Sequence, residues 1–448
     1  MRRTFPVLAL LLIASGAATP ATEPPSRVTP LLYTVAKVYE PLAWLHGAER
    51  FPSGAQIMVS AESDLHPLVR DFAASADPSV SFDGQKILFA GKAHASDPWQ
   101  IWEVALAGGA PRAITSSHED CVRPFYLPDE RVVYVRKIAG RFVIETKELS
   151  SNKALALSYI SSSSLPTDVL RDGRILFEST YPLGSNGVPE IYTVYSDGSG
   201  VESYRCDHGK ARHSARQGLS GDTVFTTQRG LAKFTSTRAQ QVSIAAPLGE
   251  YAGDVAETAT GEWLVSWRAD AKSSYRLMRW TPGTAALKPI VEELGVNVLQ
   301  PVLLAAKAVP NRHPSGLHDW PNANLLCLNA YTSKYPFAAG SIRSVRLYTR
   351  DESGHPKLLG SAPVEGDGSF FVQVPSEQPV QFELVDASGK SLKREAGYFW
   401  MRRGEQRVCT GCHAGPETAP ENAVPQTLLK STTPADLTGT TAQNAGGH

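Results

Sequence analysis

Cysteine and methionine are scarce in this chain, with five and four residues among 448. Cys409 and Cys412 lie close together, whereas Cys121, Cys206 and Cys327 are far apart in the sequence. A structural zinc site needs four ligands, and no second C-x-x-C motif is present to complete one. A redox dithiol belongs near the start of a β-α-β unit rather than near the end of a chain. We expect the three isolated cysteines to be small buried residues.

Excess charge of either sign is also absent, because 44 basic residues balance 44 acidic ones. A neutral chain argues against a nucleic-acid partner. The sequence has no G-x-S-x-G elbow, no H-E-x-x-H motif, no phosphate-binding loop and no G-x-G-x-x-G opening a helix. Any enzymatic activity would therefore come from a bound cofactor or from a site assembled by loops.

The two close cysteines belong to the stretch R-V-C-T-G-C-H, which ends at His413. C-x-x-C-H is the attachment signature of a c-type haem. Two thiols at this spacing can each add to one of the two vinyl groups on a single haem edge. His413 then lies beneath the iron as its proximal ligand. We expect one covalent haem c, held by Cys409, Cys412 and His413.

Long apolar runs are missing except near the N-terminus. Basic residues at Arg2 and Arg3 precede an apolar segment at residues 7–13, and small residues follow with possible cleavage after Ala18 or Ala21. This order predicts a secretory signal peptide over residues 1–21, too short in its apolar part to span a membrane. We expect an exported, soluble protein with no membrane span, in a bacterial periplasm or secreted.

Glycine and proline are plentiful, at 36 and 32 residues, and apolar residues come in short runs, which predicts an all-β fold. The clearest unit, residues 77–115, reads as four strands with an Asp-Gly turn at Asp83. Similar turns recur at Asp129, Asp172, Gly221 and Gly261, in steps of 46, 43, 49 and 40 residues. This spacing matches the period of a four-stranded propeller blade.

The repeat is similar to the blades of TolB-type propellers. We predict a TolB-like β-propeller over residues 28–310 with six blades, five or seven being the alternatives. Residues 28–75 would supply the sixth blade, and the segment near Gln300–Leu303 would close the ring. Two stacked β-sandwiches also fit the turn frequency, but they do not explain the regular spacing.

After about residue 310 the regular repeat of strands and turns ends. Residues 310–316 are rich in proline and polar side chains, which indicates a linker. Alternating strands then predict a small β-sandwich over 322–401, whose last strand, 397–401, leads into the motif. A c-type haem-binding segment would occupy 402–430, and a disordered tail 431–448. Tyr398, Phe399 and Trp400 are candidates for apolar haem walls or, equally, for ordinary sandwich core.

The sixth iron ligand is less evident, because no methionine follows His413. Met58, Met278 and Met401 precede it, the first two in strand-like runs. Histidines in propeller loops are the better supply, and we rank His213 first, then His208 and then His118, with His313 and His318 as further loop histidines. Each one taken alone is more simply a solvated loop histidine. An open iron site is the alternative, and it would favour ligand chemistry over electron transfer.

Three stretches of the second half share a resemblance. They are Gly340–Arg346, Gly366–Val372 and Arg402–Glu405, the last of which leads into Cys409–Gly415. Together they resemble the middle and C-terminal regions of the hydrazine synthase alpha subunit family. In that family a six-bladed propeller joins a haem-bearing C-terminal segment. The resemblance therefore implies a haem that relays electrons, with a propeller histidine, in this chain His213 or His208, as its distal ligand.

One departure from the family bears on activity. Members of the family carry a second c-type haem, where the chemistry occurs, in an N-terminal domain, but this sequence contains one C-x-x-C-H. We therefore do not expect hydrazine synthesis. The leading hypothesis is a mono-haem cytochrome c that exchanges single electrons with a redox protein or enzyme subunit. The alternatives are a haem enzyme or small-ligand sensor with an open iron, and a TolB-like binding scaffold with a structural haem.

Overall fold

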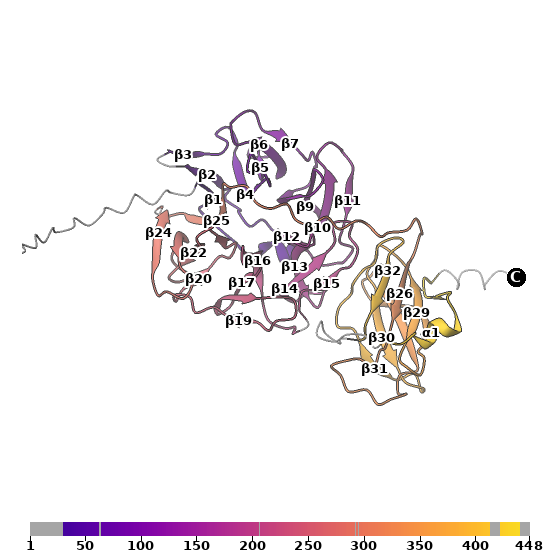
Figure 1. Ribbon diagram of the computed structural model, residues 1–448. Coiled ribbons are helices and arrows are strands. Elements are labelled where there is room, and N and C mark those ends of the chain that lie inside the picture. Colours follow the sequence, from indigo (N-terminus) through magenta and orange to yellow (C-terminus); the bar gives the residue numbers. More distant parts are fainter. Residues whose placement is uncertain are drawn as a thin grey trace, which may run out of the picture.

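The computed structural model describes residues 30–61, 64–205, 207–291, 293, 295–412 and 422–439. These residues form eight β-sheets: six are the blades of a propeller and two form a sandwich that follows it in sequence (Figure 1). The predicted all-β class, with a six-bladed propeller before a sandwich, is confirmed. The predicted signal peptide lies outside the described residues. No helix in the described part of the chain is long and apolar enough to cross a membrane.

The blades follow one another around the ring, and the strands of each blade run in order from the innermost to the outermost. Blade 1 consists of β25 (Asn297–Leu303), β1 (Leu31–Ala36), β2 (Gln56–Ala61) and β3 (Asp64–Pro67). Blade 2 consists of β4 (Ala74–Val80), β5 (Lys86–Lys92), β6 (Gln100–Ala105) and β7 (Arg112–Ala113). Blade 3 consists of β8 (Cys121–Leu127), β9 (Arg131–Ile138), β10 (Arg141–Glu148) and β11 (Ala154–Ala156).

The other three blades continue the same order. Blade 4 consists of β12 (Ser164–Val169), β13 (Ile175–Tyr181), β14 (Val188–Val194) and β15 (Glu202–Ser203). Blade 5 consists of β16 (His213–Gln217), β17 (Thr223–Thr227), β18 (Gly230–Phe234) and β19 (Val242–Ser243). Blade 6 consists of β20 (Glu250–Tyr251) and β21 (Ala256–Glu257), both paired with β22 (Trp263–Arg268), then β23 (Arg276–Trp280) and β24 (Leu287–Val291).

The ring is closed by a strand from the far end of the propeller sequence. β25 pairs antiparallel with β1, so that Val298 lies opposite Val35 and Leu303 opposite Leu31. Blade 1 therefore combines three strands from the start of the propeller with one from its end. The prediction that the segment near Gln300 closes the ring is confirmed.

The innermost strands share an irregularity that gathers charged side chains at the hub. Each strand is bulged or interrupted at its middle, and the residues with positive φ there include Asp77, Arg123, Ser214, Asp254 and Gln300. A bulge leaves one residue unpaired and turns its side chain away from the ladder. The repeated bulge thus points polar side chains into the centre of the ring.

These side chains form a buried network of ion pairs. Arg123 is bonded to both Asp77 and Asp254, and the three residues are only 3%, 3% and 4% exposed. Burial by itself would raise the pKa of Asp254, but the neighbouring Arg123 and Arg216 guanidinium groups outweigh it and hold that pKa below its usual range. Arg50 and Gln300 bond the second carboxylate, Asp77, at 2.5 and 2.6 Å. The network links separate blades, since each charge is compensated by a partner from another blade.

The predicted linker at 310–316 belongs to a longer strap that packs against the propeller. Backbone N–H groups of Leu304, Lys307 and Asn311 donate to carbonyls of Pro30, Phe82 and Arg171. A side-chain β-carbon at Gly173 would lie 2.1 Å from the Asn311 carbonyl oxygen, so only glycine permits this approach. The Asp-Gly turn of blade 4 therefore also holds the strap.

The sandwich contains two four-stranded sheets. The first is β32 (Gln406–Cys409), β26 (Ala323–Cys327), β29 (Phe370–Val374) and β33 (Ala435–Asp436). The second is β28 (Pro356–Pro363), β27 (Ser344–Arg350), β30 (Gln381–Val385) and β31 (Ser391–Arg394). Short helices lie outside the sheets: η1 (Ala43–His46) in the propeller and α1 (Gln426–Lys430) beside the sandwich.

Three predictions for this half need correction. The boundary at 401 divides the sandwich, because β32 and β33 complete its first sheet as parallel partners of β26 and β29. The strand predicted at 397–401 is reduced to a single bridge between Val380 and Phe399. The tail is ordered as far as residue 439, since Leu437 is buried in the sandwich core. Residues 440–448 lie outside the described part.

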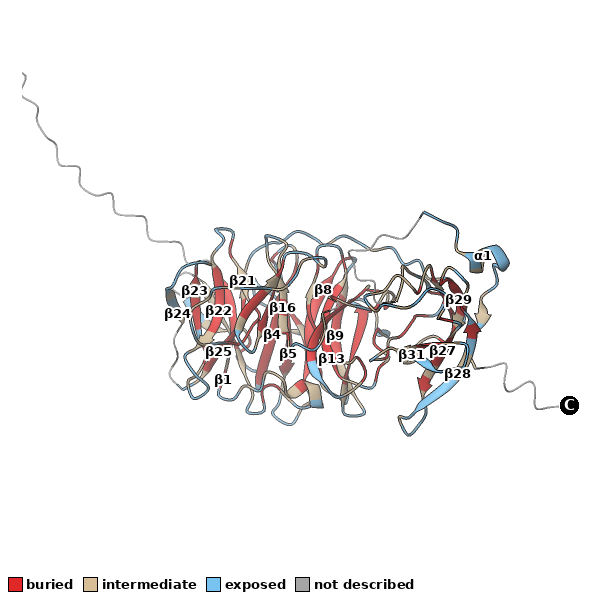
Figure 2. Cartoon of the chain, turned by 90° about the horizontal axis from the view of Figure 1, so that it is seen from below, coloured by how far each residue is buried: buried red, intermediate tan, exposed pale blue. Residues whose placement is uncertain are grey.

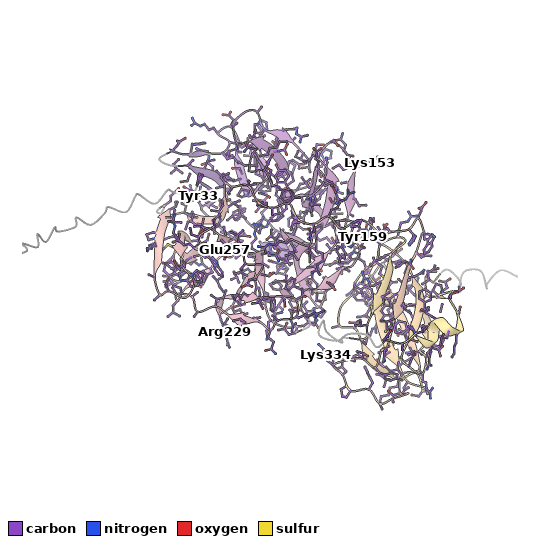
Figure 3. All side chains as sticks on the ribbon, viewed as in Figure 1. Tyr33, Lys153, Tyr159, Arg229, Glu257 and Lys334 are labelled. Carbon is purple, nitrogen blue, oxygen red and sulfur yellow. The ribbon has the colours of Figure 1, made fainter. Side chains whose placement is uncertain are left out.

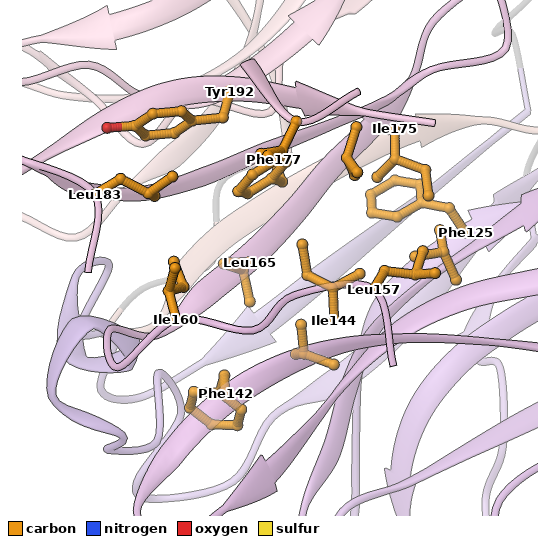
Figure 4. Packing of buried hydrophobic residues seen from close by; sticks show 14 of the residues in the cluster. Phe125, Phe142, Ile144, Leu157, Ile160, Leu165, Ile175, Phe177, Leu183 and Tyr192 are labelled. Atoms are coloured by element: carbon orange, nitrogen blue, oxygen red, sulfur yellow. The ribbon is translucent and has the colours of Figure 1, made fainter. Parts of the chain in front are cut away.

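The two domains share a packed boundary rather than a loose link. Trp400 is fully buried in the largest propeller cluster, with Phe177, Leu183 and Tyr192, three residues labelled in Figure 4. Its indole N–H donates to the Gly198 carbonyl at 3.2 Å. The Tyr398 N–H donates to the Leu183 carbonyl at 2.8 Å. The buried strands and the adjoining sandwich are seen from the side in Figure 2.

Candidate functional site

The two cysteines of the motif are positioned by the first sheet of the sandwich. β32 runs parallel to β26, which places Cys409 opposite Cys327, and the Leu328 N–H donates to the Cys409 carbonyl at 2.9 Å. Between the cysteines, a β-carbon at Gly411 would lie 2.1 Å from the Thr332 carbonyl oxygen. Only glycine fits there, so the backbone of the motif is held closely against the sandwich.

Both thiols border a large space between the sandwich and blade 4. One cavity measures about 620 Å³, and its walls include Tyr181, Leu183, Tyr192, Tyr398, Phe399 and Cys409. A second cavity of about 270 Å³ continues into the sandwich and is lined by Leu325, Phe370, Phe382, Leu384, Cys409 and Cys412. The residues that line both cavities include Phe399, Arg407, Cys409 and Gly411. Together they offer a volume in the range of cofactor sites, about 300–1,000 Å³.

His208 is the histidine that shares this space with the cysteines. It lies in the connection from blade 4 to blade 5 and lines the larger cavity. Its ring stacks on Tyr181, with centroids 4.1 Å apart and planes 8° from parallel. Its Nδ1 atom lies 2.9 Å from Glu190 Oε2. The imidazole is therefore held on one face and at one nitrogen, which leaves Nε2 for a ligand in the cavity.

His213, ranked first from the sequence, is in a different part of the molecule. It starts β16, the innermost strand of blade 5, opposite Thr226 of β17, and its Nδ1 lies 3.3 Å from Ser214 Oγ. It does not line either cavity. His213 lies in the propeller interior near Asp254, so the geometry of the cavity favours His208 over His213, which the sequence ranked first.

The largely buried position of His213 makes the stability of the protein depend on pH through the pKa of its imidazole. Burial lowers the pKa of His213 to about 4, against the opposing effect of Asp254. Between the folded value and the ordinary 6.5, the unfolded chain binds a proton at this histidine that the folded chain does not, so stability falls as the pH is lowered through this window. The loss amounts to at most about 3 kcal/mol, since part of the ring is still accessible. His213→Gln should flatten this dependence, measured as urea midpoints at about pH 4.5 and 7; an unchanged pH slope would contradict the assignment.

The other three candidate histidines do not line the cavity either. His118 is exposed in the connection between blades 2 and 3. His313 belongs to the strap and stacks on Tyr195, a residue of the cavity wall, at a centroid distance of 3.7 Å. His318 stacks on Trp320 at 4.6 Å. Of these five histidines, the structure brings only His208 to the larger cavity, which Cys409 also lines.

The residues around the cavity fit a covalently attached haem. Two thiols lie on one wall, a histidine with a fixed ring lies on another, and aromatic side chains line the space between. Burial raises the pKa of Cys412 to about 12 and also raises that of Cys409, which disfavours the thiolate that a redox dithiol needs. In the described ranges, no group of three or more His, Cys, Asp or Glu side chains is placed to hold a bare metal ion. His413, the expected proximal ligand, lies outside the described residues.

The residues that line the cavity come from both domains, and only some of them were named from the sequence. Tyr398 and Phe399 line the cavity, which is one of the two roles considered for them, whereas Trp400 packs into the propeller core. Blade 4 supplies further wall residues, Tyr181, Tyr192 and Glu202. The Trp400 ring lies edge-on to that of Tyr159, a residue labelled in Figure 3, with centroids 6.4 Å apart.

Glu190, which is hydrogen-bonded to His208 Nδ1, was not named from the sequence. It is only 1% exposed and lies in the middle of a strand. The sequence pattern that could have indicated it is a single acidic residue among apolar and aromatic neighbours, in the run V-P-E-I-Y.

Of the isolated cysteines, Cys121 and Cys327 are buried, as predicted, and both are unpaired. Cys121 lies in the propeller and Cys327 borders the smaller cavity beside Cys409. Cys206 lies outside the described residues.

Fold and site together define a class: a six-bladed β-propeller packed on a β-sandwich that carries a C-x-x-C-H motif at the boundary. Residues 338–414 match the family model of the hydrazine synthase alpha subunit middle domain. Over 77 residues the chain is 34% identical to hydrazine synthase subunit alpha of Kuenenia stuttgartiensis, a match that covers 17% of this chain and only 10% of the relative.

Solved structures extend the likeness to the fold as a whole. Kuenenia stuttgartiensis hydrazine synthase superimposes with a TM-score of 0.76 and 17% identity, covering 90% of this chain and 71% of that one. TolB from Acinetobacter baumannii matches with 15% identity, 79% and 65% coverage and a TM-score of 0.33, too low to add to the assignment. The chain is therefore hydrazine synthase alpha subunit-like: in sequence over part of the sandwich and the motif, and in fold over propeller and sandwich.

Proposed function

We propose that this protein is an exported mono-haem c-type cytochrome that transfers single electrons, with the haem in the cavity between blade 4 and the sandwich. Cys409 and Cys412 would carry it, His413 would be the proximal ligand and His208 the distal one. The observation that carries the proposal is that one cavity is lined both by the motif and by a histidine whose ring is fixed in place. The likeness to the hydrazine synthase alpha subunit supports haem association in general.

The protein's own groups would each have a limited task. The Cys409 and Cys412 thiols would add across vinyl double bonds, each forming a thioether and giving its proton to the adjacent carbon. Tyr181, Tyr398 and Phe399 would exclude water from the cavity. A bound haem would supply one-electron chemistry, and His413 and His208 as its two protein ligands would leave no position open for substrate.

The partner and the location follow from this role. One redox centre can only pass an electron on, so we propose a redox protein or an enzyme subunit as its partner. The matched relative is itself named a subunit, which supports this choice. C-type attachment goes with an oxidising compartment, and with the signal-like N-terminus it supports a bacterial periplasmic or secreted location.

Optical redox titration of protein matured in a host that attaches c-type haem tests the proposal. We expect covalent haem, low-spin bands in both redox states, a single Nernst transition for one electron and no change of the reduced spectrum with carbon monoxide. A high-spin spectrum that shifts with carbon monoxide would instead support a haem enzyme or sensor. If no haem is covalently attached, the proposed function is wrong and the result supports the alternative of a TolB-like binding scaffold.

A further inference from the structure

Glu190 is a buried acidic residue beside the candidate distal ligand. It lies at the centre of β14, opposite Ser179 of β13, and is only 1% exposed. Acidic side chains are almost never buried to this extent without a partner. The partners of this one are unusual, since its hydrogen bonds within the described chain go to a histidine and a backbone N–H rather than to an arginine or lysine.

Both oxygens of Glu190 are used by the segment that carries His208. Oε2 lies 2.9 Å from His208 Nδ1, and Oε1 accepts the Gly209 backbone N–H at 2.5 Å. The carboxylate therefore clamps the histidine and the residue after it. The Tyr181 stack fixes the same ring from its face. Rotation of the imidazole would break the hydrogen bond and the stack together.

The hydrogen bond also decides which ring nitrogen carries the proton. A carboxylate accepts only, so Nδ1 must be the donor, and the electron pair of the neutral ring is then on Nε2. A histidine ligand whose other nitrogen donates to a carboxylate becomes a stronger electron donor to its metal. Stronger donation favours the more positive oxidation state of the metal.

We propose that Glu190 is a positioning residue that orients His208 and lowers the reduction potential of the haem iron. This inference rests on the proposed function, because it requires His208 to be the distal ligand. It adds a determinant of the potential that lies on the propeller, beyond the motif that holds the haem.

The test is potentiometry of Glu190→Gln in the full-length haem-loaded protein, with Glu202→Gln as the matched control. Glu202 also lines the cavity, but it pairs with Arg174 at 2.6 Å rather than with His208. For Glu190→Gln we expect at least a ten-fold rise in the ratio of reduced to oxidised protein at a fixed potential, which is about 59 mV for one electron. Glu202→Gln should shift the ratio by less than half as much on the logarithmic scale.

The haem content and spin state of the wild-type protein distinguish failure of this inference from failure of the proposed function. Equal shifts in both variants, or none in Glu190→Gln, would overturn the inference while leaving a low-spin wild-type protein and the proposed function intact. A wild-type protein without haem, or with an open iron, would overturn the proposed function first. If Glu190→Gln does not take up haem, Glu190→Asp decides: its shorter carboxylate should raise the potential part of the way, and a wild-type potential would contradict the inference.

Discussion

Arg123→Met should destabilise the propeller by about 3–5 kcal/mol, the cost of removing one charged partner from each of two buried carboxylates. Arg123 is only 3% exposed, and its guanidinium donates to Asp254 and lies 3.6 Å from Asp77, carboxylates that are themselves almost inaccessible. Methionine keeps much of the length of the side chain but offers no hydrogen-bond donor. The two acidic groups would then lose the counter-charge that they share, and only Arg50 beside Asp77 and Arg216 beside Asp254 would remain. The loss is large beside a typical unfolding free energy of about 5–15 kcal/mol.

The measurement is urea unfolding at neutral pH, followed by tryptophan fluorescence. Arg312→Met is the control, because Arg312 pairs with Asp129 at 3.0 Å on the surface, with 70% and 42% of the two side chains exposed. An exposed pair contributes at most about 1 kcal/mol. Equal midpoints for the two variants would show that the hub network does not hold the blades together.

Replacing Cys409 and Cys412 by alanine should abolish covalent haem attachment completely. In the proposed function each thiol would supply one of the two bonds, and among the described cysteines only Cys327 also borders these cavities, deeper in the sandwich. The variant should still fold, because the propeller and both sheets keep their cores. Intact mass and denaturing gels stained for haem give the readout.

The control for this variant is Cys121→Ala, which changes a buried cysteine in the propeller core instead of the motif. It should retain one haem per chain and lose only packing. Haem that stays bound to the double cysteine variant after denaturation would contradict attachment at the motif. Single variants should retain one thioether each and show lower yields.

The features that could be predicted from the sequence are those with a local signal. Asp-Gly turns such as Asp83-Gly84 mark a tight bend between two strands, and their regular recurrence indicates the number of blades. The motif is likewise local, since its two thiols and histidine lie within five consecutive residues. Periodicity and turn chemistry suffice for such features.

The features that could not be predicted depend on contacts between distant segments. The residues of β32 look like part of an appended segment because their parallel partner β26 lies 82 residues earlier, and parallel pairing leaves no hairpin signal. His208 and His213 are close in sequence and look alike as loop residues. Which one meets the motif depends on the packing of blade 4 against the sandwich, through contacts such as Trp400 to Gly198.

The central claim is that His208 binds the iron opposite the motif, and a pair of carbon monoxide difference spectra tests it most directly. Reduced, haem-loaded His208→Ala and His213→Ala are compared with the wild-type protein. We predict that carbon monoxide changes the spectrum of His208→Ala alone, because only there does the iron lose a ligand. A change in His213→Ala with none in His208→Ala would contradict the claim and return the distal position to His213.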